Sequence, residues 1–336
     1  MPSIGLHDLP PELVLQILEW TIAEYDDPLS SILRQESYRT LLPLAHLSRS
    51  FQHPAQSLLH RTLGFSDAIT GELYLDADQE SNFPLEFGTQ TLLLYGAGLV
   101  ESTGITAVLA RKIIAKTRGL QSLRLCFIGK LEEDILSLPQ LADLASLELM
   151  TAILPSSRPV VLPSKLSSLS LSTWKYPPLF VPSLLRASAS TLTSLSISLA
   201  ASTPDLDGIL DAFQLVAPIL HFLDLTNLSP LPSAFPPLLS LCPSLTRLQH
   251  LTLSRIEELH TLLASTPSRI EKLSTKVFLR DITPENVALL DDCLALDSMS
   301  ALKEWSFAQT AEAPTVEAKA FLDRCRESGP TIRFGC

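Results

Sequence analysis

A leucine motif recurs through most of this 336-residue chain and restricts the folds open to it. The motif is Leu-x-x-Leu-x-Leu, and successive copies begin 22 to 32 residues apart. The eight copies begin at Leu120, Leu144, Leu166, Leu192, Leu220, Leu248, Ile270 and Leu302. Thr91–Tyr95 fits one period upstream, and Thr331–Phe334 fits near one period downstream. A spacing of this length is typical of a fold that repeats one structural unit.

Each copy of the motif predicts a short β-strand, because its leucines alternate with other residues and so point to one face. Successive copies are too far apart for hairpins, so we expect parallel pairing through right-handed crossovers. Apolar spacing predicts helices in several crossovers. These are expected at 102–118, at 206–216, at 256–264, from Thr283 onwards, and at 315–328 before Gly329-Pro330.

The N-terminal residues have a different, helical pattern. Leu9-Pro10-Pro11-Glu12 is a helix start, because proline is tolerated in a first helical turn. Leu13, Val14, Ile17 and Leu18 follow on one helix face. Further helices are predicted at 29–47 and around Leu58, Leu59 and Leu63. We therefore divide the chain into a helical module at 1–63, a junction at 64–90 with one short strand at Glu72–Leu75, and about eight to ten irregular repeats at 91–336.

Composition excludes several classes of function. The net charge of −11 disfavours nucleic acids and anionic membranes as partners. No apolar run approaches the roughly 20 residues that span a bilayer, and the N-terminus does not resemble a secretory signal. The five cysteines are scattered and form no CxxC pair. We expect an intracellular protein, cytoplasmic or nuclear, with reduced thiols.

Catalytic motifs are equally scarce. Tyr95-Gly-Ala-Gly98 contains a GxG, but Glu101 stands where the dinucleotide fingerprint needs its third glycine. The seven histidines form no HExxH motif, and no serine lies in a Gly-x-Ser-x-Gly elbow. The acidic clusters at 132–134, 205–211 and 291–292 fit exposed helix surfaces. We predict that the protein is not an enzyme and has no metal or cofactor.

The residues that alternate with the strand leucines form a better candidate site. In the first half of the array they are mostly serine, which suits a crowded, solvated sheet. The second half contains Phe222, Asp224 and His250, and aromatic and charged side chains supply most binding energy at interfaces. Trp174 and Tyr176, in a proline-rich loop, are a second candidate. For each residue, packing within the fold is the simpler alternative.

Two families resemble parts of this sequence. Leu9-Pro10-Pro11-Glu12-Leu13, Ile17-Leu18 and the later Leu44–Phe51 resemble an F-box. The second half departs from that motif, with Ser48 near the usual cysteine, Phe51 at the usual tryptophan and an extra stretch of about ten residues. Residues 91–336 resemble leucine-rich repeats, without the asparagine that often follows each strand.

The resemblance implies an α/β fold, in which a small three-helix F-box-like module precedes a leucine-rich-repeat solenoid with its parallel sheet on the concave side. It also implies a substrate receptor of a Skp–cullin–F-box ubiquitin ligase, which belongs to the ubiquitin-conjugation pathway. The residues implied to bind the Skp-type adaptor are Leu9, Pro10, Pro11, Leu13, Ile17 and Leu18. The repeats would hold an unknown protein substrate. The alternative is a repeat scaffold whose first helix is buried against Thr91–Tyr95 as a cap.

Overall fold

The computed structural model describes residues 10–23, 43, 49–80, 88–96, 104–131, 134–153, 162, 165–172, 179–198, 206–225, 235–250, 256–278, 282–308 and 315–334. The chain forms two compact units. The first unit comprises Met1–Gly129 and Leu138–Asp143, and the second comprises Lys130–Ser137 and Leu144–Cys336. The predicted helix at 29–47 lies almost wholly outside the described residues.

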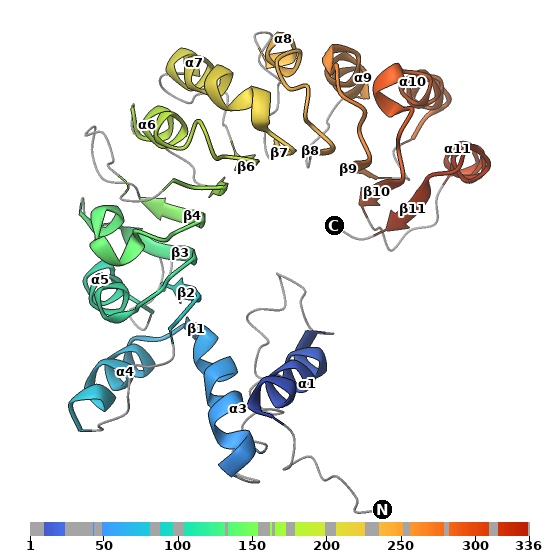
Figure 1. Cartoon of the computed structure of the whole chain (residues 1–336). Coiled ribbons are helices and arrows are strands. Elements are labelled where there is room, and N and C mark those ends of the chain that lie inside the picture. Colours follow the sequence, from blue (N-terminus) through green and yellow to red (C-terminus); the bar gives the residue numbers. More distant parts are fainter. Residues whose placement is uncertain are drawn as a thin grey trace, which may run out of the picture. The chain divides into compact units, whose positions relative to one another are not determined.

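Helices lie between most successive strands in both units (Figure 1). The first unit contains α1 (Pro11–Ala23), α3 (Arg49–Arg61), β1 (Thr62–Phe65), α4 (Ala68–Glu80), β2 (Thr91–Tyr95), α5 (Ala107–Lys116), β3 (Ser122–Lys130, whose last residue belongs to the second unit) and η4 (Pro139–Leu141). The second contains η3 (Ile135–Ser137), β4 (Ser146–Ile153), β5 (Ser168–Ser172), α6 (Phe180–Ala187), β6 (Ser194–Ile197), α7 (Leu206–Val216), η5 (Ala217–Ile219), β7 (Phe222–Asp224), α8 (Phe235–Leu239), β8 (Arg247–His250), α9 (Ile256–Ser265), β9 (Lys272–Phe278), α10 (Pro284–Leu294), η7 (Asp297–Met299), β10 (Glu304–Ala308), α11 (Val316–Ser328) and β11 (Thr331–Phe334).

The leucine motif forms the parallel strands that its alternation predicts. In the first unit β1, β2 and β3 pair in that order, and in the second unit β4 to β11 do the same. Leu147, Leu169, Leu195 and Leu223 occupy one register and are buried. Within the second unit, α6 to α11 cover the outer side of the strands (Figure 1). The expected α/β fold with parallel strands is therefore confirmed.

Helix starts and stops also follow the sequence signals. Helix α7 has the predicted bounds, and α10 and α11 begin after Thr283 and Thr315. Each threonine side chain accepts a hydrogen bond from a backbone N–H in the first turn of its helix, which satisfies a group without a helical partner. Gly329 ends α11 with φ of 106°, a left-handed conformation that favours glycine.

A ladder at the starts of the strands ties successive repeats together without an asparagine. The backbone N–H groups of Ser167, Thr193 and His221 each donate to the carbonyl of the residue one repeat earlier. Hydroxyls reinforce the ladder, since Ser167 Oγ donates to the Ala145 carbonyl and Thr193 Oγ1 to the Ser167 carbonyl. The ladder lies at the starts of the strands, opposite to the ends that the asparagine of leucine-rich repeats often follows.

Residues 64–90 contain more structure than the sequence indicated. The strand predicted at Glu72–Leu75 is wrong, because these residues lie in helix α4. The Asp67 side chain accepts a hydrogen bond from the Thr70 N–H at 2.8 Å, which favours a helix start there. Leu63, expected in a helix, instead lies in β1, where it is in register with Leu92 of β2.

Helix α4 packs closely on α5. A Cβ placed on Gly71 would lie 3.1 to 3.2 Å from the side chains of Ile105, Leu109 and Ile113, so glycine permits this close approach. Lys116 of α5 donates from Nζ to the Tyr74 carbonyl at 2.9 Å and to the Leu75 carbonyl at 3.0 Å. Its ammonium also lies 4.9 Å from the centroid of the Tyr74 ring.

We expect Lys116→Met to lower the free energy of unfolding by about 1 to 2 kcal/mol, because hydrogen bonds from a charged donor and a cation–π contact are lost while the apolar stem remains. Urea denaturation followed by circular dichroism measures this loss. Lys112→Met is the matched control, since Lys112 lies one turn earlier on α5 and is exposed. Equal effects of the two substitutions would contradict this role of Lys116.

Candidate interaction surfaces

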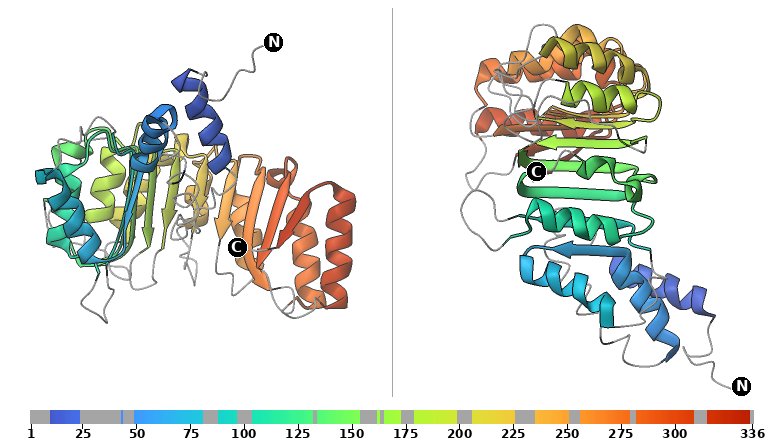
Figure 2. Two further views of the ribbon diagram at one scale, coloured as in Figure 1. Left: turned by 90° about the horizontal axis from the view of Figure 1, so that it is seen from below. Right: turned by 90° about the vertical axis from the view of Figure 1, so that its left-hand side faces the viewer.

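Helix α1 begins where the double proline predicts. The N–H groups of Leu13 and Val14 donate to the Pro10 carbonyl at 3.0 and 3.1 Å. Pro11 is the first helical residue, where a missing N–H costs nothing. Helices α1 and α3 lie side by side (Figures 1 and 2). Their contact is a small apolar cluster that contains Val14 and Leu18 from α1 and Ala55 and Leu58 from α3.

The apolar residues of α1 divide between two neighbouring faces. Val14 and Leu18 are buried against α3. Leu13 and Ile17, also four residues apart, retain 45% and 37% of their surface exposed. Residues at this spacing lie above one another on a helix, so Leu13 and Ile17 form one apolar stripe. We call this pair the α1 stripe.

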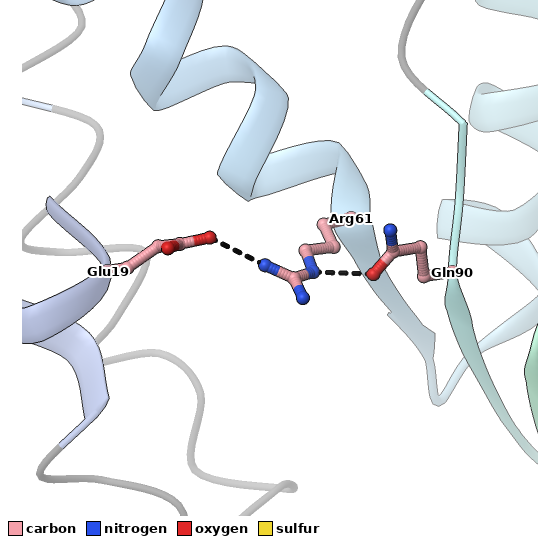
Figure 3. Close-up of polar contacts among 3 residues, drawn as sticks. All are labelled: Glu19, Arg61 and Gln90. Atoms are coloured by element: carbon pink, nitrogen blue, oxygen red, sulfur yellow. Dashed lines mark hydrogen bonds and ion pairs between the residues drawn. The ribbon is translucent and has the colours of Figure 1, made fainter. Parts of the chain in front are cut away.

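An arginine connects the α1–α3 pair to the repeat strands of the first unit (Figure 3). Arg61, the last residue of α3, donates from Nη1 to Glu19 Oε1 of α1 at 2.7 Å. Its Nε donates to Gln90 Oε1, next to β2, at 2.6 Å. The Gln90 N–H in turn donates to the Arg61 carbonyl at 2.9 Å. The cluster that holds α1 is made by α3, and not by the residues 91–95 that a capping helix was expected to cover.

The residues implied to bind an adaptor therefore have different environments. Pro10 is exposed beside the α1 stripe, and Leu18 is part of the buried contact with α3. Pro11 begins α1, but the placement of its side chain is not described. Leu9 lies outside the described residues. The helical periodicity of the sequence does not show that Leu18 is buried while Leu13 and Ile17 are exposed, because the three residues lie on one broad apolar side of the helix.

The second candidate surface is the face of the second unit opposite α6 to α11. Phe222 and Asp224 lie two residues apart on β7 and so have the same orientation. Phe222 is half-buried, whereas Asp224 is buried and accepts a hydrogen bond from Ser196 Oγ at 2.9 Å. Asp224 thus has a role within the fold. Trp174 and Tyr176 lie outside the described residues.

The predicted place of His250 beside Phe222 is wrong, because the motif of β8 begins three residues earlier than predicted. Arg247, and not His250, is in register with Phe222, and Gln249 is in register with Asp224. Two alignments of the motif overlap in Leu245–Leu253, and the structure uses the first, in which His250 takes the place of the last leucine. The interval of 25 residues from Leu220 to Leu245, repeated from Leu245 to Ile270, was the signal that identifies this register.

Charged side chains gather on the same face across β8 to β11. Arg247, Lys272 and Glu304 occupy one register on β8, β9 and β10. Glu304 Oε2 lies 3.4 Å from Lys272 Nζ, and Glu304 Oε1 lies 3.4 Å from Nε of Arg333 on β11. We call Arg247, Lys272, Glu304 and Arg333 the charged patch. None of these four residues is among the candidate residues that the sequence analysis names.

Cys242, Cys293 and Cys325 are buried free cysteines in the part of the chain that the structure describes. Burial raises the pKa of the Cys242, Cys293 and Cys325 thiols to about 12, so they remain protonated at neutral pH. Among the described residues, no three His, Cys, Asp or Glu side chains are placed to hold a metal ion. Within the same ranges, every helix is too short or too polar to cross a membrane.

Comparisons with known proteins gave one kind of match. No family model matches the chain, and no curated protein matches its sequence. Among solved structures, the chain is similar to the leucine-rich repeat-containing protein LegL7 from Legionella pneumophila, with a TM-score of 0.45 and 18% sequence identity over 81% of each chain. The chain's own buried leucine register and parallel strands show an α/β fold that repeats one leucine-bearing unit.

Proposed function

We propose that this protein is a non-catalytic substrate receptor of a Skp–cullin–F-box ubiquitin ligase. The α1 stripe and Pro10 would bind the Skp-type adaptor, and through it a cullin. The repeats would hold a protein substrate. Such a receptor works by raising the effective concentration of one partner beside another and supplies no reactive side chain.

The observation that carries the proposal is the second apolar face of α1. Val14 and Leu18 are buried against α3 and account for the packing of α1 within its unit. Leu13 and Ile17 instead remain exposed next to the Leu-Pro-Pro-Glu start that resembles an F-box. Burial of an aliphatic side chain contributes about 1.5 to 3 kcal/mol. Two such residues supply enough free energy to decide whether a complex survives purification.

We expect Leu13→Asp with Ile17→Asp to abolish co-purification of a Skp-type adaptor, because the substitutions place two carboxylates in an apolar interface. The measurement is affinity purification of the full chain co-expressed with the adaptor. Circular dichroism should remain unchanged, since both positions are exposed in the free protein.

The chain provides a matched control in the same unit. Ile69 and Leu73 of α4 are also an isoleucine and a leucine four residues apart, and they are 72% and 62% exposed. The variant Ile69→Asp with Leu73→Asp should retain the adaptor. Adaptor binding that survives in the α1 variant, or is absent from the wild type, would favour the scaffold with N-terminal capping helices instead.

A further inference from the structure

The charged patch has the opposite sign from the chain as a whole. It contains Arg247, Lys272 and Arg333 but only one carboxylate, Glu304, whereas the whole sequence has 36 acidic and 25 basic residues. At the edge of the patch, Lys303 Nζ and Glu271 Oε1 form an ion pair at 3.0 Å. This pair adds one positive and one negative charge and so does not change the net charge of the region. On this face, cations therefore outnumber carboxylates across β8 to β11, whereas the chain as a whole is acidic.

The patch is also available to a ligand. The Lys272 and Arg333 side chains are 45% and 64% exposed, and both lie beside the same carboxylate, which is 18% exposed. Arg247 is exposed and forms no ion pair with any residue that the structure describes. It lies next to the half-buried Phe222 across the β7–β8 pair. Glu304 is thus shared by Lys272 and Arg333, whereas Arg247 has no carboxylate partner among the described residues.

The spacing of the cations matches an extended peptide. Neighbouring strands are about 4.8 Å apart, so the three strand intervals from β8 to β11 span about 14 Å. Arg333 also lies two residues further along its strand than Arg247, so their backbones are about 16 Å apart, a distance that two long arginine side chains can shorten. Side chains at positions i and i+4 of an extended peptide point the same way and lie about 13 Å apart. Carboxylates at these positions would reach Arg247 and Arg333, with Lys272 between them. A guanidinium also accepts a carboxylate through two parallel hydrogen bonds.

We propose that the charged patch binds an extended segment rich in Asp and Glu. That this segment belongs to the protein captured for ubiquitination rests on the proposed function, whereas peptide binding itself does not. Glu304 acts as an internal competitor, since it occupies the two cations that an incoming carboxylate would bind. A peptide is favoured over a nucleic acid because the rest of the chain is acidic and would repel a long polyanion.

The test is fluorescence anisotropy of a fluorescein-labelled glutamate-rich peptide with the purified full chain at low salt. We expect binding that weakens as salt rises, and no binding of the same peptide with glutamine at every glutamate. Arg247→Gln with Lys272→Gln should weaken binding about tenfold. Glu304→Gln should strengthen it about threefold, because it frees Lys272 and Arg333 from their internal partner. Loss of folding cannot produce an increase.

A matched control removes the same charges elsewhere. Lys319→Gln with Arg326→Gln deletes one lysine and one arginine from exposed positions of α11 and should leave the affinity unchanged. An equal loss in this control, or weaker binding in Glu304→Gln, would overturn the proposal. So would binding of a phosphoserine peptide but not the glutamate peptide, tighter binding of single-stranded RNA, or self-association of the chain through the patch.

Adaptor co-purification separates this inference from the proposed function. The Arg247→Gln, Lys272→Gln variant should retain the adaptor, because α1 is unchanged. Adaptor binding without peptide binding in the wild type would overturn only the peptide site. Peptide binding without adaptor binding would overturn only the ligase role.

Discussion

Trp305→Ala should lower the free energy of unfolding of the C-terminal repeats by about 3 to 5 kcal/mol, the usual cost of removing a large buried aromatic ring. Trp305 is fully buried on β10. Its ring stacks on Phe307 at 5.0 Å between centroids and meets the edge of Phe321 of α11 at 5.7 Å. Its Nε1–H also donates to Thr275 Oγ1 at 3.1 Å. The substitution therefore removes apolar contacts and leaves a buried hydroxyl without its donor.

Hydrogen exchange of backbone amides is the appropriate measurement, because repeats contact mainly their neighbours and lose stability locally. Exchange should accelerate in β9 to β11 and stay unchanged in α1 to α5. Phe334→Ala is the control, since Phe334 is an aromatic residue of the adjacent strand whose side chain is exposed. Uniform acceleration along the chain, or an equal effect of the control, would contradict a local role of Trp305.

The strands were predictable because their signal is long-range. Trp305 and Phe307 take leucine positions of the motif, and both are buried as the alternation requires. The register of β8 was mistaken because Leu245, Leu248 and Leu251 are equally spaced, so two motifs overlap. The pairing of β8 with β7 and β9 distinguishes the two alignments, in agreement with the equal intervals of 25 residues on either side of Leu245.

Residues 62–80 escaped prediction for a different reason. Thr62-Leu-Gly-Phe65 contains one leucine and a glycine, so it lacks the motif that identifies the other strands. Its pairing with Thr91–Leu94 nevertheless makes it a strand. Helix α4 exposes Ile69 and Leu73 and fits α5 through Gly71, so its apolar residues do not mark its buried side. Tertiary contacts determined both elements.

The candidate surfaces could be located from the sequence but not resolved into contacts. The helix start at Pro10-Pro11 and its apolar residues were evident. Which of those residues contact α3 depends on where α3 docks, and Leu18 proved to be buried while Leu13 and Ile17 are not. Arg333 lies about one repeat after the last clear motif, in a segment that lacks the leucine pattern. Its ion pair with Glu304 therefore follows only from the pairing of β11 with β10.

The GxG of residues 96–98, rejected above as a nucleotide-binding motif, has a structural explanation at its first glycine. A Cβ on Gly96 would lie 2.1 Å from the Phe127 carbonyl oxygen and 2.6 Å from the Ile128 Cα. The Gly96 N–H donates to the Cys126 carbonyl at 2.8 Å, which draws the two segments together. Phe127 itself has φ of 56°, a strained value for a bulky residue, so this part of β3 has little freedom to move away.

We therefore expect Gly96→Ala to destabilise the first unit by about 3 kcal/mol or more, because the new methyl group meets backbone atoms that no change of rotamer can displace. Urea denaturation and hydrogen exchange in β2 and β3 measure the loss. Gly64→Ala is the matched control, since a Cβ there would meet its nearest neighbour, Leu93 Cβ, at an ordinary 3.9 Å. A Gly96→Ala protein as stable as Gly64→Ala would mean that residues 126–128 can move away from β2.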